Sequence, residues 1–259
     1  MATVFVGGFL RTGTTLMQNL LCAAPGTHSM LGEVTYLLGL VESYGRSVHM
    51  WDVSARHYFS SPEALRDFSR HQVLEFLDHT RVHLGGPEHL VLKYPQLTGL
   101  FPLLSTLLPE ARFVVMVRDP RDAVASARRA GARGAPEFQS STPQSIAHEF
   151  MTTYRSALGG ARPQYNAARV VVRFEDLVRD PEAVLGAIGA RTGLDLSHPS
   201  LVGDLQLSTQ AGSSPLRSAL VGQLPNATRI GQYGSVLTPR EVSEVCRICQ
   251  PLMAQLHYR

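Results

Sequence analysis

The chain has 259 residues, 44% of them hydrophobic and 17% charged, which is enough for one globular α/β domain (1–259) with a large core, and we expect no second domain. Its net charge of +3 is too small for a general nucleic-acid-binding surface but suits a local basic pocket for an anionic ligand. The basic residues are almost all arginines, because Lys93 is the only lysine. The odd count of three cysteines predicts a reducing compartment rather than a disulfide framework.

The first stretch of the chain predicts a strand, a phosphate-binding loop and a helix. An apolar run, Val4–Val6, leads to Gly8 and Gly13, which occupy the glycine positions of the nucleotide-binding pattern G-x-x-x-x-G-K-[ST]. Thr14 stands where that pattern has its lysine. The loop therefore keeps a backbone cradle for an anion without the triphosphate lysine. With the strand beginning by Thr3 or Val4, we expect no leader or membrane anchor and a cytoplasmic enzyme.

The next segment is predicted to be mainly helical. A helix from Thr14 to Ala24 ends at Pro25-Gly26, and Glu33 lies near the start of an apolar helical stretch. Residues 45–60 are predicted to be irregular. Ser61-Pro62 then caps a long helix that runs to about Leu84. We expect this block to form a helical cover over an acceptor site.

The remainder of the chain alternates strands and helices. Strands are expected from His89 to Lys93, at Arg112–Asp119 and at Arg169–Phe174, with helices at 97–108, 120–129, 143–158 and 181–192. This order predicts a P-loop-like parallel β-sheet flanked by helices, whose ligands bind at the carboxyl ends of the strands. The chemistry is therefore expected at the loop Gly8–Thr15, at Lys93 and at Arg118.

The C-terminal part carries weaker signals. Residues 202–236 lack periodicity, and a loop of that length is typical of a functional segment that closes over a ligand. A capping box at Thr238–Glu241 starts a last helix, which Pro251 is expected to kink or end. Cys246 and Cys249 have no second ligand pair in the sequence, so we interpret them as half-buried thiols on one helix face.

These elements together resemble the sulfotransferases that use 3′-phosphoadenosine 5′-phosphosulfate (PAPS), and within them the tyrosylprotein sulfotransferases. The resemblance runs nearly end to end. It rests on Gly7–Met17, Gly32-Glu33, Lys93-Tyr94-Pro95, Leu108–Asp119 and Pro251–Tyr258. The first loop alone is moderately specific, whereas the ordered set of motifs is strong.

The resemblance implies a role for each matching residue. Arg11 and the segment Thr12, Gly13, Thr14 and Thr15 would bind the 5′-phosphosulfate, and Arg118 with Ser126 would bind the 3′-phosphate. Glu33 would be the general base for the acceptor hydroxyl, and Lys93 would neutralise the leaving-group oxygen. Many relatives have a histidine base two residues after this lysine, where this chain has Pro95. Arg229 loosely matches a late cofactor-contact region, with a plain loop arginine as the alternative; a helix-capping role is the alternative for Glu33.

Sulfuryl transfer is consistent with this residue set, because it depends mainly on alignment and charge stabilisation. We expect PAPS as co-substrate, 3′-phosphoadenosine 5′-phosphate (PAP) as product and no metal, since an ion pair is the simpler interpretation of Asp119. Two other functions stay open. One is a P-loop kinase or NTPase, which Thr14 disfavours, and the other is a noncatalytic nucleotide-binding module.

The acceptor is less well defined by the sequence. After Glu33 the chain has Val34-Thr35-Tyr36 and lacks the arginines that the peptide enzymes use near their acidic substrates, and it lacks their membrane anchor and disulfide pattern. A small alcohol or phenol is therefore at least as good a candidate as a tyrosine peptide. We expect no nucleic-acid or membrane partner, and the oligomeric state stays open.

Overall fold

The computed structural model describes residues 1–160, 162–197 and 227–258, and its centre is a parallel sheet. The four strands lie in the order β2-β1-β3-β4. They are β1 (Thr3–Gly8), β2 (Leu90–Lys93), β3 (Arg112–Val117) and β4 (Arg169–Arg173), and each neighbouring pair is parallel. The predicted parallel sheet is confirmed, and all four strands end at the same edge.

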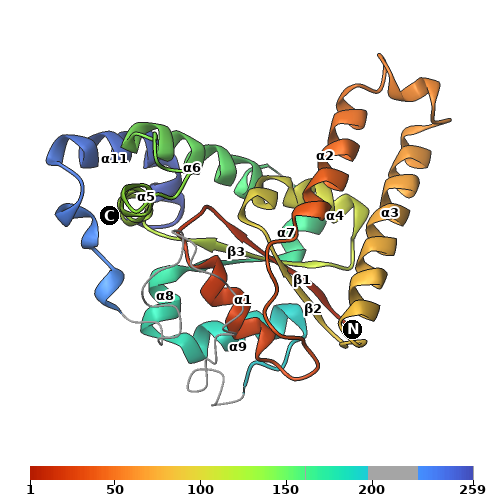
Figure 1. Cartoon of the computed structure of the whole chain (residues 1–259), viewed down its shortest axis with the longest axis horizontal. Helices are drawn as coiled ribbons and strands as arrows, with labels where there is room; N and C mark the ends of the chain where they lie inside the picture. Colours follow the sequence, from red (N-terminus) through yellow and green to blue (C-terminus); the bar gives the residue numbers. More distant parts are fainter. Residues whose placement is uncertain (161, 198–226, 259) are drawn as a thin grey trace.

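Helices cover both faces of the sheet (Figure 1). One face is covered by α1 (Thr14–Cys22), α8 (Phe174–Arg179) and α9 (Pro181–Thr192). The other face carries α4 (Phe101–Leu107), α6 (Pro143–Leu158) and α7 (Pro163–Ala168). Beyond the strand ends, α5 (Pro120–Ala132) and α11 (Pro239–Gln255) pack against α6.

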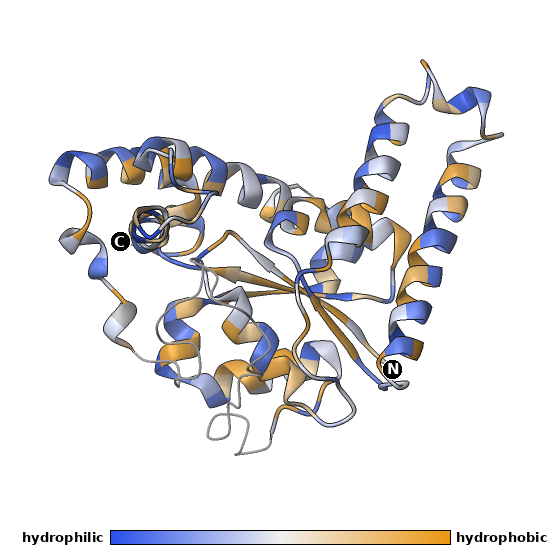
Figure 2. Cartoon of the chain, in the orientation of Figure 1, coloured by the Kyte–Doolittle hydropathy of each residue, from blue (hydrophilic) through white to orange (hydrophobic). Residues whose placement is uncertain are grey.

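Each face has its own hydrophobic core because side chains alternate along a strand. In β1, Phe5 belongs to one core, whereas Val4 and Val6 belong to the other. In β3, Phe113 and Val115 alternate in the same way with Val114 and Met116. The central parts of the strands therefore appear hydrophobic in Figure 2.

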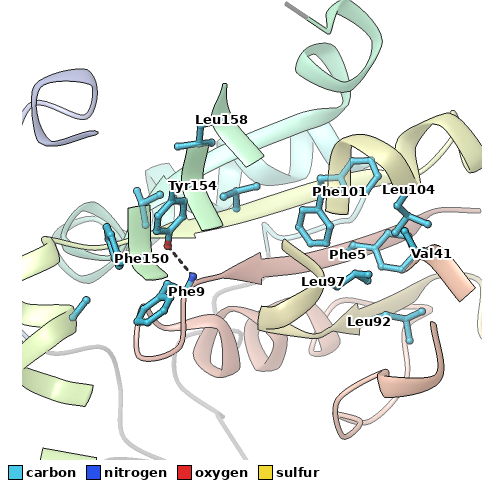
Figure 3. Close-up of a cluster of buried hydrophobic side chains, with 14 of the residues drawn as sticks. Phe5, Phe9, Val41, Leu92, Leu97, Phe101, Leu104, Phe150, Tyr154 and Leu158 are labelled. Carbon is cyan, nitrogen blue, oxygen red and sulfur yellow. Dashed lines mark hydrogen bonds between the residues drawn. The ribbon is translucent and has the colours of Figure 1, made fainter. Parts of the chain in front are cut away.

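The aromatic core holds the end of β1 in place (Figure 3). The hydroxyl of Tyr154 accepts a hydrogen bond from Phe9 N at 2.9 Å and donates one to Met116 O at 2.6 Å. Thr98 Oγ1 accepts from Gly8 N at 2.7 Å. These fully buried groups fix the point at which β1 leaves the sheet.

An antiparallel pair of helices, α2 (Thr35–His49) and α3 (Pro62–His83), projects from the β2 side of the molecule (Figure 1). The expected cap of α3 is confirmed, since Ser61 Oγ accepts from Ala64 N at 3.2 Å. The prediction that the chain becomes irregular at Gly45 was wrong, because α2 continues to His49. A Cβ at Gly45 would lie 2.7 Å from Leu103 Cδ2, so the glycine allows α4 to approach α2 closely.

Several other boundaries differ from the prediction. The helix expected at 97–108 is a 3₁₀ helix, η2 (Pro95–Leu100), followed by α4. The fourth strand ends at Arg173, and α8 begins at the next residue. The last helix, α11, continues through Pro251 to Gln255. Two further 3₁₀ turns, η3 (Ala227–Arg229) and η4 (Gln232–Ser235), precede it, and η1 (Ala55–His57) lies between α2 and α3.

The cysteine thiols are largely buried. Cys249 lies in the core, and Cys22 and Cys246 are half-buried. Burial raises the pKa of the Cys22 and Cys249 thiols to about 12. Within the described ranges, none of the helices has the length and apolar character needed to cross a bilayer.

Candidate active site

The predicted anion loop is a strained turn between β1 and α1. Gly8 has φ +142°, Gly13 has φ +96°, and Arg11 has φ +76°, which is uncommon for a residue with a side chain. Gly13 is the N-cap of α1, and no side chain in the described part of the chain caps this helix. Its first-turn amides and its dipole therefore favour an anion at the end of β1.

The side chains of this turn have different environments. Thr12 is fully buried and donates a hydrogen bond from Oγ1 to Phe9 O at 2.6 Å, so its hydroxyl stabilises the turn. Thr14 is buried, whereas Thr15 is exposed. A Cβ at Gly13 would lie 2.8 Å from Phe174 Cδ2, which explains why a glycine stands there. Thr14 and Thr15 are the first two residues of α1.

Lys93 and Glu33 form an ion pair at the end of β2. Lys93 Nζ donates to Glu33 Oε1 at 2.9 Å. The Lys93 side chain is 9% exposed and that of Glu33 is 38% exposed, so the carboxylate faces solvent while the ammonium lies beneath it. Lys93 pairs with Val6 in the β1–β2 register, one strand away from the turn. The structure thus brings together the two residues predicted to be catalytic.

Arg118 follows β3 and lies against the same turn. Its Nη1 donates to Arg11 O at 3.2 Å, and its guanidinium stacks 4.6 Å from the centre of the Phe174 ring. Arg11 Nε in turn donates to Ser126 Oγ at 3.3 Å. Arg11 and Ser126, which the resemblance assigned to two different anionic groups, are therefore direct neighbours. The basic side chains of both predicted subsites form one continuous cluster.

The start of α5 is held by two carboxylates. Asp119 is the N-cap and pairs with Arg121, with Nη2 and Oδ2 2.6 Å apart, as expected for an ion-pair residue. Asp122 is 2% exposed and accepts from two backbone amides, Gly231 N at 2.7 Å and Tyr233 N at 3.0 Å. Burial raises the pKa of Asp122, while the Gly231 amide lowers it. The carboxylate ties the segment after η3 to the helix that carries Ser126.

A further carboxylate supports the end of β3. Glu175, which is 3% exposed, accepts from Asp119 N at 2.9 Å and from the Tyr258 hydroxyl at 2.9 Å. Burial and the Glu175 charge raise the pKa of Tyr258. Sequence reasoning missed both Asp122 and Glu175 as supporting residues. Glu175 lies two positions after the end of β4, in the first turn of α8, where acidic residues are common, so the sequence carried no specific signal for its role.

Not every predicted site residue can be placed. Arg229 ends η3, two residues before Gly231, but its side chain is outside the described part of the structure. Residues 202–226 of the segment predicted to close over the ligand also lie outside the described residues. Within the described ranges, no group of three or more His, Cys, Asp and Glu residues is arranged to hold a metal.

Solved structures with a similar fold are bacterial sulfotransferases and sulfotransferase domains. The sulfotransferase domain from the curacin biosynthetic pathway matches with a TM-score of 0.64 and 17% identity, covering 100% of this chain and 98% of that domain. The domain of the Synechococcus olefin synthase matches with a TM-score of 0.60 and 18% identity, over 97% and 94% of the two chains. At these identities the likeness establishes the fold.

Sequence comparison gives the family. Protein-tyrosine sulfotransferase 1 of Danio rerio is 33% identical over 129 residues, 49% of this chain and 35% of the relative. The human protein of the same name is 33% identical over 129 residues and 34% of its own length, so the match spans about a third of these relatives. The model of the Sulfotransferase family matches residues 3–198, which include Glu33, Lys93, Arg118 and the anion turn. This chain therefore belongs to the sulfotransferase family.

Proposed function

We propose that the protein transfers a sulfuryl group from PAPS to a hydroxyl acceptor by in-line displacement. The observation that carries this proposal is the 2.9 Å pair of Lys93 Nζ and Glu33 Oε1, one strand away from a positive-φ turn at an uncapped helix N-terminus. A cation for a leaving group and a carboxylate for an incoming hydroxyl are needed together. The family match and the fold are consistent with this pairing.

The donor fits the residues at the strand ends. PAPS, when bound, supplies the electrophilic sulfur, and PAP is the group that leaves. The α1 amides, Arg11 and the hydroxyls of Thr14 and Thr15 form a site for one anionic group. Arg118 and Ser126 extend the same basic cluster toward α5 and would bind the 3′-phosphate. Arg229 is a candidate third contact, since it lies close in sequence to the Gly231 amide that Asp122 holds.

Glu33 and Lys93 have different roles in the proposed transfer. Glu33 accepts the proton of the acceptor hydroxyl as attack proceeds, and its partly exposed carboxylate is open to an acceptor arriving from solvent. Lys93 stabilises the negative charge that develops on the leaving oxygen. Because Lys93 also pairs with Glu33, the carboxylate is oriented before the acceptor arrives. No step in this scheme draws on a metal.

The acceptor proposed for this site is a neutral alcohol or phenol rather than an acidic tyrosine peptide. Tyr36, which is 64% exposed and whose ring centre lies 5.2 Å from that of Phe76, is three residues after Glu33. Tyr94 follows Lys93, and burial and the negative charges of Glu33 and Glu42 raise its pKa. Aromatic rings and carboxylates near the base favour an uncharged ring and repel acidic side chains.

The acceptor preference is tested by matched phenols. With PAPS present, we expect a sulfuryl mass gain on a neutral phenol at a rate at least about tenfold above that on a tyrosine flanked by glutamates, because like charges at a site cost roughly 1 kcal/mol or more each. Equal rates, or a faster peptide, would contradict the assignment of a neutral acceptor.

Donor binding is tested by calorimetric titration with PAP in the presence of a chelator. We expect metal-independent binding that Arg118→Ala weakens by about a hundredfold or more, since a charged hydrogen-bonding partner of a phosphate is lost. Arg112→Ala, at the opposite end of the same strand, is the matched control and should bind normally. Absence of PAP binding by the unmodified protein would refute the proposal, and Mg²⁺-dependent turnover of ATP would favour a P-loop kinase instead.

A further inference from the structure

The outer edge of β2 provides a set of hydrogen-bonding groups that the sheet itself does not use. β2 is the outermost strand in the order β2-β1-β3-β4. Leu90 N donates to Ala2 O at 2.9 Å, so this residue faces β1. Residues that alternate with Leu90 along the strand, namely His89, Val91 and Lys93, therefore direct their backbone groups away from the sheet.

The loop that carries Glu33 pairs with these three residues in turn. His89 N donates to Gly26 O at 2.9 Å, and Val34 N donates to Lys93 O at 3.1 Å. Between them, Val91 N donates to the Nε2 atom of His28 at 3.0 Å. The segment 26–34 thus binds the free edge of β2 as a further strand would. At the middle contact, the His28 ring accepts the hydrogen bond that a backbone carbonyl would accept in a true strand.

This middle contact requires one state of the His28 ring. The Nδ1 atom lies 2.8 Å from Ser29 O, a carbonyl that only accepts, so Nδ1 carries the proton. Nε2 is then the unprotonated nitrogen that accepts from Val91 N. A second proton on the ring would place an N–H group against an N–H group and break the contact.

The contacts on either side connect His28 to the candidate base. Val34, whose amide is the last contact, directly follows Glu33 in the chain and bonds the carbonyl of Lys93 itself. On the side of α1, Gln18 Nε2 donates to Leu31 O at 3.2 Å. The position of Glu33 relative to Lys93 is therefore set by a short stretch of loop pinned at Gly26, His28, Leu31 and Val34.

We propose that His28 is a positioning residue that holds the Glu33 loop on β2, and that it does so only as a neutral imidazole. The role in turnover rests on the function proposed above. The charged groups around the ring come from two elements: Arg81, near the end of α3, acts on it electrostatically, and Glu88 and His89 adjoin Gly26 before β2. Burial and the Arg81 charge lower the pKa of His28 below its ordinary value of 6.5.

Two substitutions of His28 separate the effect of its hydrogen bond from the effect of its titratable ring. Gln places an amide oxygen near the position of Nε2 and cannot titrate, whereas Ala removes the acceptor. We expect His28→Ala to lower kcat by about 10- to 100-fold with PAP affinity unchanged, because a small displacement of a catalytic group is costly. We expect His28→Gln to keep most of the activity at pH 7.5. In the wild-type protein, kcat should fall below pH 6.5 partly because His28 becomes protonated, and this part of the fall should be absent in His28→Gln. The matched control, His57→Ala in η1, should leave the pH profile unchanged.

A measurement without turnover separates this proposal from the proposed reaction. Amide hydrogen exchange at Val91, followed by NMR, should be slow at pH 7.5, faster in His28→Ala and restored in His28→Gln, and the ¹⁵N shifts of His28 should report the Nδ1–H tautomer. If amide exchange follows this pattern and no sulfuryl transfer is found, the structural role of His28 is supported and the proposed reaction is refuted. Unchanged Val91 exchange in His28→Ala, or a wild-type kcat profile in both variants, would overturn the positioning role.

Discussion

The Lys93–Glu33 pair concentrates the proposed chemistry in two side chains with unequal exposure. An ammonium group buried as deeply as that of Lys93 is costly unless it is paired, and Glu33 is its partner at 2.9 Å. The carboxylate has a second oxygen and is exposed enough to meet an acceptor. In the proposed reaction, a single pair would thus serve both the stability of β2 and the proton transfer.

Replacing the base while keeping its shape tests this arrangement. We expect Glu33→Gln to lower kcat by roughly 10²- to 10⁴-fold, the range for a lost general base, while the Kd for PAP changes less than about threefold. Rates of sulfuryl mass gain and calorimetric PAP titrations measure the two quantities. Glu182→Gln, an exposed carboxylate in the first turn of α9, is the control. A variant with normal kcat would remove Glu33 from the mechanism.

At the scale of elements, α5 connects the nucleotide side of the site to the end of the chain. Asp122, in its first turn, accepts from the Gly231 and Tyr233 amides, and Arg121 stacks 4.7 Å from the centre of the Tyr233 ring. Arg129 Nη2 donates to Gln232 O at 3.2 Å and to Ser235 Oγ at 2.8 Å. One helix therefore fixes the segment that follows Arg229.

The Asp122 contacts can be removed with little change in size. In Asp122→Asn one oxygen becomes an NH₂ group that faces a backbone N–H, so an acceptor is lost and a donor is left unpaired. Hydrogen bonds to charged groups contribute about 1.5–3 kcal/mol, so we expect PAP affinity to fall by about tenfold or more, with kcat at saturating PAPS near normal. Titration calorimetry and saturation kinetics give the two values. Asp67→Asn, on α3, should behave as wild type.

Element boundaries were predictable where a local signal decides them. The apolar run of β3, the β1–turn–α1 unit and the proline-started helices α3, α5, α6, α9 and α11 all agree with the sequence patterns. Gly45 was misleading because it lies within α2, and Pro251 does not end its helix because α11 continues to Gln255. The close approach of Leu103 explains why position 45 is a glycine. A contact of this kind between two helices cannot be recognised in the sequence around Gly45.

For the candidate site, the sequence predicted which charged residues lie at the ends of strands. Lys93 ends β2 and Arg118 follows β3, as the sequence predicts, whereas the roles assigned to Glu33, Arg11 and Ser126 stay predictions. The supporting groups were not predictable, because Asp122, Glu175 and His28 act through bonds to residues 109, 56 and 63 positions away in the sequence. Hydrogen bonds of that range depend on packing, which periodicity and spacing do not encode.

At the scale of the whole molecule, the sheet separates two cores that share its strands. Cys249 lies in the core of Phe5 and Phe113, and Cys22 packs against the core of Val4 and Val114. Burial raises the pKa of both thiols to about 12, so neither thiolate is present in quantity near neutral pH.

The two thiols therefore act as probes of opposite faces. We expect both to resist alkylation at pH 8 in the native protein and to become reactive at the same urea concentration, because β1 and β3 belong to both cores and the chain should unfold as one unit. Mass spectrometry of urea-dependent alkylation measures each site. Separate midpoints for Cys22 and Cys249 would show that the two layers unfold independently.

Lys93, at the end of β2, also makes the protein easy to label with amine-directed reagents. Because Lys93 is the only lysine among 259 residues, an amine-directed acylating reagent has one ε-amino target besides the α-amino group. That target is 9% exposed and shielded by a carboxylate, so its modification reports the opening of the Glu33 contact. Peptide mapping distinguishes the mass added at Lys93 from that added at the α-amino group, and a bound nucleotide that covers the proposed site should slow only the reaction at Lys93.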